Sequence, residues 1–180
     1  MAVHFFHTSD WHLGQLFHNH ERDLEHKQFL NWLLEQIKLK QPHALLIAGD
    51  IFDVINPAAS AQKQLYKFLA DAHAIAPHMQ TLMIAGNHDS GYRIEQVDPL
   101  LAKYNAKAVG IIQRTAENQL DLDHLLVPIY NSQQEIVAWC LALPYLRSSE
   151  ITGLNEHTSN HQSAITYLHE QLIAEAKARK

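Results

Sequence analysis

Short apolar runs alternate with longer amphipathic segments over the first half of the chain. The runs that predict strands buried on both faces of a sheet lie at residues 3–8, 44–48 and 81–85. Apolar side chains at helical spacing indicate helices at residues 21–40, 58–74 and 98–104. The first helix has an apolar face that includes His26, and the second is expected to begin at an Asn56–Pro57 cap. This alternation predicts an α/β fold in which helices flank a mostly parallel sheet.

The pattern changes beyond Val109. Residues 125–130 and 135–143 resemble strands, and the short polar stretch between them predicts an antiparallel hairpin. Residues 162–180 predict a final helix. The 180 residues contain no internal repeat, low-complexity tract or long linker, so we expect a single domain.

The composition narrows the class of protein. Hydrophobic residues make up 47% of the chain and charged residues 18%, which is an ordinary globular mixture. The chain has no apolar run of membrane-spanning length, and its first residues lack the features of a secretory signal. The one cysteine, Cys140, cannot form an intrachain disulfide, which favours the cytoplasm. The net charge of −5 excludes a basic nucleic-acid-binding domain by composition.

Each predicted parallel strand runs directly into a polar cluster. The clusters contain Asp10 and His12 after the first strand, Asp50 and Asp53 after the second, and Asn87, His88 and Asp89 after the third. Because the carboxyl ends of parallel strands line one crevice, these three distant segments are expected to meet there. Carboxylate and amide oxygens together with imidazole nitrogens suit manganese, iron or zinc better than calcium. Any one cluster is ordinary turn chemistry, but the three together predict a divalent metal site.

The three clusters read D-x-H, G-D-x-x-D and G-N-H-D, and in this order they resemble the motifs of the calcineurin-like metallophosphoesterases. The wider stretches at residues 7–15, 48–53 and 85–90 are similar to the Mre-type DNA repair nucleases of that superfamily. The similarity extends beyond residues 144–147 and covers nearly the whole chain. It implies a calcineurin-like sandwich of a mostly parallel sheet, helices and a C-terminal hairpin.

The resemblance also implies a centre with two divalent ions, most often Mn²⁺, that hydrolyses DNA phosphodiesters. The metal ligands implied by motif position are Asp10, His12, Asp50 and Asn87, with Asp50 bridging the ions. His88 would face the phosphate with Asp89 behind its imidazole, and Asp53 would support the ligands. Double-strand exonuclease and single-strand endonuclease activities are implied, together with an SMC-type ATPase partner in DNA recombination and repair. A homodimer is implied as well, although helix 58–74 could equally serve only in core packing.

One departure from the family is large, because the sequence contains no G-H-x-H motif. Three later histidines, His157, His161 and His169, lack the glycine of that motif, and the last two are interpreted as surface residues of a helix. The simplest interpretation is that residues 1–180 form the N-terminal part of a longer nuclease domain. The later strands that carry the remaining histidines would then be absent, and this chain alone would be poorly active or inactive.

Two alternatives to a DNA nuclease remain open. The first is a metallophosphoesterase that acts on small phosphodiesters or phosphoproteins, which the D-W-H-L-G stretch and the hairpin disfavour. The second is a non-catalytic fragment or interaction module without the full metal site, which the missing histidines favour.

Overall fold

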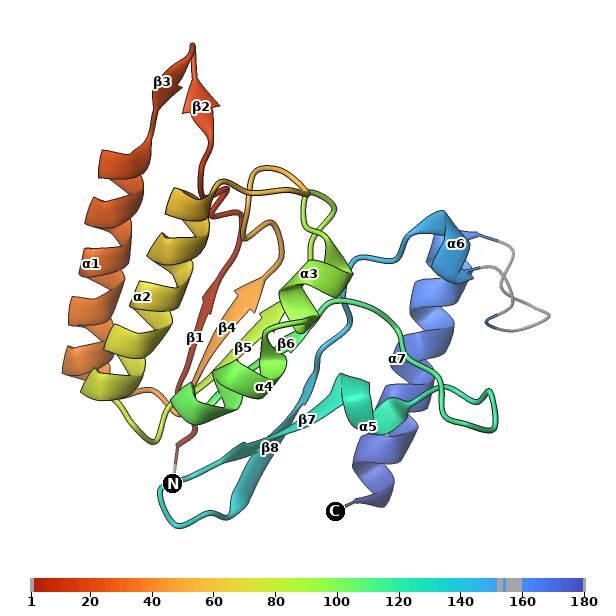
Figure 1. The fold of residues 1–180 in the computed structure, drawn as a ribbon. Coiled ribbons are helices and arrows are strands. Elements are labelled where there is room, and N and C mark those ends of the chain that lie inside the picture. The colour runs from red at the N-terminus through yellow and green to blue at the C-terminus, as the bar shows by residue number, and fades with distance from the viewer. Residues whose placement is uncertain (1, 152–153, 155–159, 180) are drawn as a thin grey trace.

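A parallel sheet is the centre of the computed structural model, which describes residues 2–151, 154 and 160–179. Four strands lie in the order β1-β4-β5-β6, and every adjacent pair is parallel. They are β1 (Phe5–Thr8), β4 (Ala44–Ala48), β5 (Gln80–Ile84) and β6 (Ala106–Val109). Because the strands share one direction, the loops that follow β1, β4 and β5 leave the sheet at the same edge (Figure 1).

Helices α1 (Asp23–Lys40) and α2 (Ala59–Ile75) pack side by side against one face of the sheet (Figure 1). The residues that α1 buries are those of its predicted face: His26, Leu30, Leu33 and Ile37. The Trp11 ring packs edge-on between Phe29 of α1 and Phe68 of α2, with ring centroids 5.8 and 5.2 Å away. This packing fixes the loop after β1 onto the core, since Trp11 lies within that loop.

The opposite face of β4, β5 and β6 is covered by the antiparallel hairpin of β7 (Leu126–Tyr130) and β8 (Ile136–Leu141). Helix α7 (His161–Ala178) contributes Leu172 to the same buried cluster. Gln80 at the start of β5 joins the two layers. Its amide nitrogen donates to Pro128 O at 2.9 Å, and its amide oxygen accepts from Tyr130 N at 2.6 Å. The predicted α/β class with a C-terminal hairpin is therefore confirmed.

Short elements connect these layers. They are β2 (Leu16–Phe17), β3 (His20–Glu21), α3 (Gly91–Glu95), α4 (Asp98–Leu101), the 3-10 helix η1 (Ala102–Tyr104), α5 (Leu122–Leu125) and α6 (Ser148–Ile151). The strands β2 and β3 form a small hairpin that projects beyond the sheet next to the loop after β1 (Figure 1). In the described part of the chain, no helix combines the length and apolar character needed to cross a membrane.

Two local predictions are wrong. The strand β1 is not buried on both faces, because it is the edge strand and the apolar cluster beneath the hairpin draws on β4, β5 and β6. Burial alternates along β1, and Phe5 is 43% exposed. The predicted cap of α2 also differs, since the helix begins at Ala59 and the Ala58 side chain cannot cap it.

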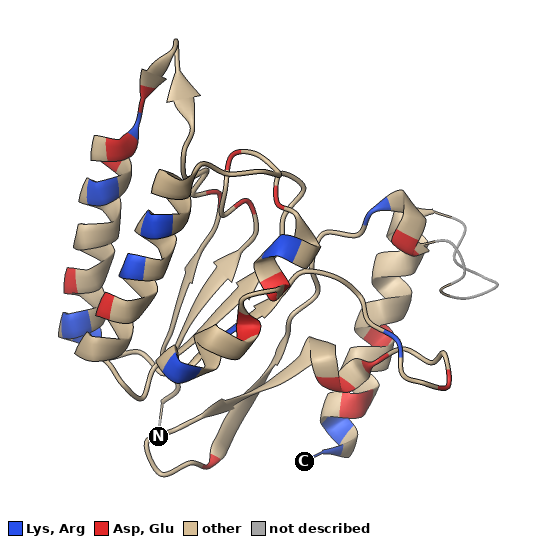
Figure 2. Ribbon diagram, viewed as in Figure 1, with Lys and Arg blue, Asp and Glu red and all other residues tan. Residues whose placement is uncertain are grey.

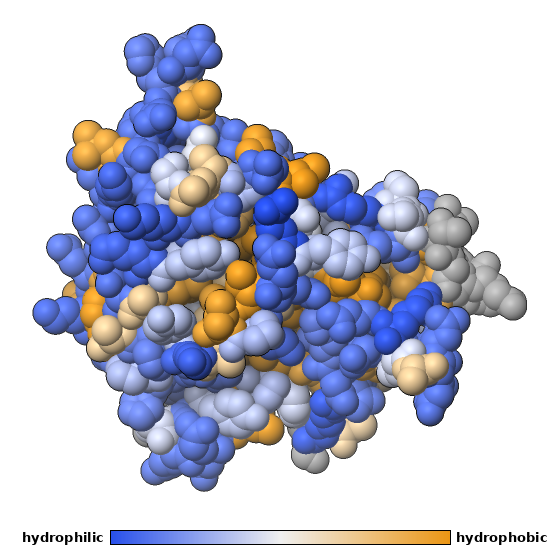
Figure 3. Space-filling model, in the orientation of Figure 1, coloured by the Kyte–Doolittle hydropathy of each residue, from blue (hydrophilic) through white to orange (hydrophobic). Residues whose placement is uncertain are grey.

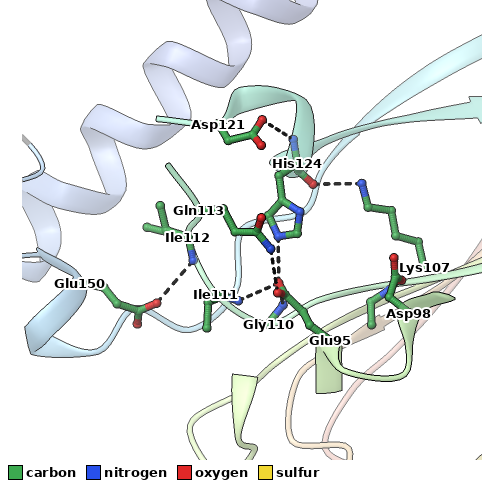
Figure 4. A network of polar contacts seen from close by, with 11 residues as sticks. Glu95, Asp98, Lys107, Gly110, Ile111, Ile112, Gln113, Asp121, His124 and Glu150 are labelled. Atoms are coloured by element: carbon green, nitrogen blue, oxygen red, sulfur yellow. Dashed lines mark hydrogen bonds and ion pairs between the residues drawn. The ribbon is translucent and has the colours of Figure 1, made fainter. Parts of the chain in front are cut away.

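A buried carboxylate, Glu95 at the end of α3, joins the first layer to the hairpin layer (Figure 4). Oε1 of Glu95 accepts from Gly110 N at 2.7 Å and Ile111 N at 3.1 Å, and it lies 2.8 Å from His124 Nε2. Oε2 accepts from Gln113 Nε2 at 2.9 Å. Burial alone would raise the pKa of Glu95, but these hydrogen bonds outweigh it and hold the pKa below its ordinary value.

We predict that Glu95→Gln lowers the free energy of unfolding at pH 7 by roughly 1–3 kcal/mol, because the amide leaves some of these buried donors without an acceptor. The folded-state pKa is depressed, so the carboxylate contributes its stability above the unfolded pKa of about 4.3 and loses it as the pH falls through the folded pKa. Urea unfolding at pH 7 and at pH 3.5 should therefore show a smaller difference between variant and wild type at the lower pH.

The matched control for this prediction is Glu35→Gln, which changes an exposed carboxylate on α1. Its effect should stay within about 0.5 kcal/mol at both pH values. A loss of stability in Glu95→Gln that is equal at the two pH values would contradict the proposed charge dependence.

Candidate functional site

The loops after β1 and β4 lie edge to edge and continue the pairing of their strands. Asp10 N donates to Gly49 O at 3.1 Å, and His12 N donates to Asp50 O at 2.9 Å. The pairing continues at Leu13, which forms an isolated parallel bridge with Phe52. Backbone hydrogen bonds therefore place Asp10 and His12 against Asp50.

Three of these residues have a backbone conformation that side chains other than glycine rarely adopt. The φ angles are 56° at Asp10, 46° at His12 and 49° at Asp50. Such conformations concentrate at functional sites, where the surrounding structure imposes them. The loop after β5 also comes unusually near, because a Cβ at Gly86 would lie only 2.1 Å from Asp50 Oδ1.

Asp10, His12 and Asp50 converge on one point of the crevice. One donor atom from each side chain lies within 4.8 Å of the others, and His12 Nε2 is 3.8 Å from Asp50 Oδ2. Asp53 Oδ1 lies 3.1 Å from His12 Nδ1. A carboxylate only accepts hydrogen bonds, so in the neutral imidazole Nδ1 carries the proton and Nε2 keeps its lone pair on the side of Asp50. A carboxylate behind a metal-binding imidazole acts in this way in many metal sites.

This donor set fits a divalent cation. Two carboxylates and an imidazole suit manganese, iron or zinc. Acidic positions gather on the loops above the carboxyl ends of the strands (Figure 2), where a cation would relieve their mutual repulsion. His12, Asp53 and His88 form a second cluster within 4.8 Å, but their Nδ1 and Oδ1 atoms already pair with one another or with backbone. The first cluster is therefore the better candidate for an ion.

His88 stands beside this cluster on the exposed side. Its Nδ1 lies 2.8 Å from Asp53 O, and since a carbonyl only accepts, Nδ1 carries a proton. Its ring centroid is 4.9 Å from that of His12. The hydrogen bond to the Asp53 carbonyl raises the pKa of His88 above its ordinary value, with further contributions from the carboxylates of Asp50 and Asp53. The imidazolium form of His88 is thereby favoured.

Asp89 lies where the sequence did not indicate. We expected its carboxylate behind the imidazole of His88, but Asp89 is completely buried and turns toward the backbone. It accepts from Ile51 N at 3.1 Å, Phe52 N at 3.0 Å and Gly86 N at 2.9 Å. The carbonyl of Asp53 takes the expected place behind His88. Asp89 therefore fastens the loop after β4 to the loop after β5, because backbone amides in both loops lack other acceptors there.

Asn87 occupies the exposed crest of the loop after β5, between Gly86 and His88. Sequence reasoning missed a residue that contacts this loop, namely Arg147. Its Nη2 donates to Asp89 O at 2.7 Å and lies 3.5 Å from Asn87 O. Arg147 belongs to a segment that resembles the family, but no feature of its spacing indicated this contact.

The later histidines lie away from the described crevice or outside the described residues. His161 and His169 are on α7 as predicted, and their rings contact the carbonyls of Leu146 and Ile165 at 2.9 Å. His157 lies outside the described residues.

Comparison with known proteins assigns the family. The model of the calcineurin-like phosphoesterase family matches residues 3–159. That match includes the whole crevice described above and most of the chain. The chain belongs to the calcineurin-like phosphoesterase family.

Within this family the chain is similar to one named component of a nuclease, the SbcD subunit of the nuclease SbcCD. It is 36% identical over 178 residues to the SbcD of Rhodobacter capsulatus, covering 98% of this chain and 44% of that protein. Identity to the SbcD of Escherichia coli is 31% over 180 residues, covering 97% and 42%. The chain therefore spans less than half the length of these relatives. A crystal structure of the Pseudomonas putida nuclease MPE overlaps 62% of this chain and 50% of its own, with a TM-score of 0.38 and 19% identity.

We predict that Asp89→Asn destabilises the fold strongly, by roughly 2–4 kcal/mol. The amide offers one acceptor oxygen in place of two, and it brings two buried donors toward backbone N–H groups. Urea unfolding without metal measures this loss. Asp71→Asn is the matched control, because it breaks only the exposed contact with Lys67 and should cost less than about 1 kcal/mol. Equal midpoints for the two variants would show that Asp89 does not hold the loops together.

Proposed function

We propose that the chain is the metal-binding part of a nuclease that hydrolyses DNA phosphodiesters. The observation that supports this best is the convergence of Asp10, His12 and Asp50 beside the exposed imidazole of His88. The named activity of its relatives, the SbcD subunits of the nuclease SbcCD, agrees with this chemistry. Family membership makes a phosphoester the natural substrate class.

The cofactors that we infer are two divalent ions, with Mn²⁺ the first choice. Asp10, His12 and Asp50 would hold the first ion, and Asp50 with Asn87 would hold the second. When bound, such ions neutralise phosphate oxygens and lower the pKa of a coordinated water. The two oxygens of Asp50 already have different environments: Oδ1 accepts from His88 N at 2.9 Å, and Oδ2 is the one near His12.

His88 is the residue that we place on the phosphate. Its Nδ1 is committed to the Asp53 carbonyl, so its Nε2 is left to meet a substrate. In the imidazolium form, Nε2 can donate to a phosphate oxygen or pass its proton to the leaving oxygen. Asp53 supports both imidazoles, through its carboxylate at His12 and its carbonyl at His88. Asp89 acts only through the backbone that carries these residues.

We infer DNA recombination and repair in the cytoplasm as the setting, with an SbcC-like SMC-type ATPase as the partner. The relatives are subunits of an SbcCD nuclease by name, which supports this partner. The net charge of −5 adds a physical reason, because this chain does not attract DNA by its overall field. A partner with basic surface would supply that attraction.

A non-catalytic module is the second candidate. Only Asp50 and Asn87 are placed to hold a second ion, and metal affinity falls when ligands or their supports are lost. The sequence also lacks a G-H-x-H motif. We therefore expect slow hydrolysis by this chain, and assays need a large excess of protein over DNA.

The test uses end-labelled duplex DNA with Mn²⁺ and follows Mn²⁺ binding by calorimetry. His88→Ala should keep Mn²⁺ binding and lower the hydrolysis rate by about 10²–10⁴-fold, as expected for loss of an acid–base group. Asp50→Asn should weaken Mn²⁺ binding by about 10–100-fold and abolish hydrolysis. His78→Ala, an exposed histidine before β5, is the matched control and should change neither quantity.

Each other outcome has a definite meaning. If His88→Ala lost Mn²⁺ as completely as Asp50→Asn, the role given to His88 would be wrong. Cleavage of a small chromogenic phosphodiester without cleavage of DNA would favour a small-substrate enzyme. Mn²⁺ binding without hydrolysis of either substrate would favour the non-catalytic module.

We also propose a homodimer that uses the surface around α2, α4 and η1. Large side chains are exposed there, with 76% of Tyr92, 63% of Leu100 and 40% of Tyr104 accessible. They border a hollow of about 370 Å³ that Tyr66 and Leu101 help to line. Figure 3 shows apolar side chains gathered on this face of the molecule. Apolar surface of this kind, rimmed by polar residues, is typical of a protein–protein contact.

We predict that Leu100→Glu converts the dimer to a monomer, because a charged side chain in a buried apolar contact is left without a partner. Light scattering should show the mass falling to about half, at an unchanged melting temperature. Leu39→Glu, at an equally exposed leucine on α1, is the matched control and should stay dimeric. A wild-type chain that is monomeric at high concentration would contradict the dimer.

A further inference from the structure

The segment between β8 and α6 runs beside the loop that carries Asn87 and His88. Tyr145 N donates to Ala85 O at 2.8 Å, directly before that loop begins. Two residues later, Nη2 of Arg147 donates to Asp89 O at 2.7 Å, with Asn87 O at 3.5 Å. The segment thus approaches the crevice from the hairpin layer, and the contacts join residues that are 58 and 60 positions apart.

The two carbonyls that face Arg147 flank His88 on either side. The amides of the same loop point inward, since His88 N donates to Asp50 Oδ1 and Gly86 N donates to Asp89 Oδ2. A loop held only by its amides could still rotate its outward carbonyls toward water. The guanidinium restrains that outer side, and its planar fork can meet two oxygens with one nitrogen group where a lysine ammonium is a single mobile point.

Arg147 is itself held in place from the hairpin layer. Its backbone N donates to Glu150 Oε2 at 2.8 Å, and Glu150 Oε1 accepts from Ile112 N at 3.4 Å (Figure 4). The neighbouring Leu146 O is 2.9 Å from His161 Nε2 on α7. Glu95 fixes the stretch from Gly110 that leads into Ile112. A continuous set of contacts therefore runs from the hairpin layer through Arg147 to the crevice.

We propose that Arg147 is a positioning residue that holds the loop of residues 86–89 so that Asn87 and His88 face the cluster of Asp10, His12 and Asp50. The role of that loop in hydrolysis rests on the proposed function, whereas its restraint by Arg147 does not. Arg147 acts through the loop backbone and makes no contact with phosphate in this assignment.

Amide hydrogen exchange on the metal-free chain tests the restraint without any assay of activity. Arg147→Ala should speed exchange in a peptide covering residues 85–90 by at least about tenfold, because the protected amides of Gly86 and His88 then open more often. Peptides from α1 and α2 should not change. Arg147→Lys should fall between Arg147→Ala and wild type, since an ammonium can reach one carbonyl. Arg114→Ala, on the exposed turn near residues 114–118, removes the same charge away from the loop and should behave as wild type.

Mn²⁺ binding and kinetics form the second readout. Arg147→Ala should weaken Mn²⁺ binding by about 10–100-fold, as loss of a supporting contact does in other metal sites, and lower kcat with little change in KM for DNA. Unchanged exchange in residues 85–90 would overturn the proposal, as would faster exchange throughout the chain. A rise in KM alone that disappears at high salt would also overturn it, because Arg147 would then act as a DNA contact. If wild type proves inactive, the exchange result still decides the role of Arg147 while the proposed function fails separately.

Discussion

The buried carboxylate of Asp89 is the contact on which the crevice depends. It gathers backbone amides from the loops after β4 and β5, and these two loops carry Asp50, Asp53, Asn87 and His88. The carboxylate is completely removed from water, so its charge is compatible with the interior only while these amides surround it. The amides in turn have few other acceptors, because the chain turns sharply at Gly49 and Gly86. The charge and the loop geometry therefore require each other.

Around this contact the chain uses two layers for different purposes. The sheet with α1 and α2 provides a rigid base, and Trp11 fixes the first loop to it. The hairpin layer covers the far face of the sheet and reaches the crevice only through the segment that ends at Arg147. Glu95 joins the two layers at their other contact. Strain in one layer can thus reach the loop of His88, although no residue of the hairpin itself enters the crevice in the described part of the chain.

The sequence predicted the features that depend on local pattern. The strand at residues 44–48, the buried face of α1 and the convergence of the polar clusters all follow from periodicity and from the shared direction of parallel strands. The exposure of β1 could not be predicted, because VHFFHT is apolar whether or not a second layer covers it. β6 contains a lysine and has only four residues, so it gave no apolar run. Asp89 was misplaced because a carboxylate next to a histidine in sequence need not face it, and the contact of Arg147 depends on packing between distant segments.

The left-handed backbone at Asp10 and His12 has a consequence for how this site can vary. An L-residue gives up about 1 kcal/mol or more to adopt that conformation, whereas glycine adopts it freely. Glycine at either position would relax the backbone and remove a metal-binding atom in the same step. The most stable form of this loop is therefore not the one that can bind an ion, and selection for stability alone would erase the site.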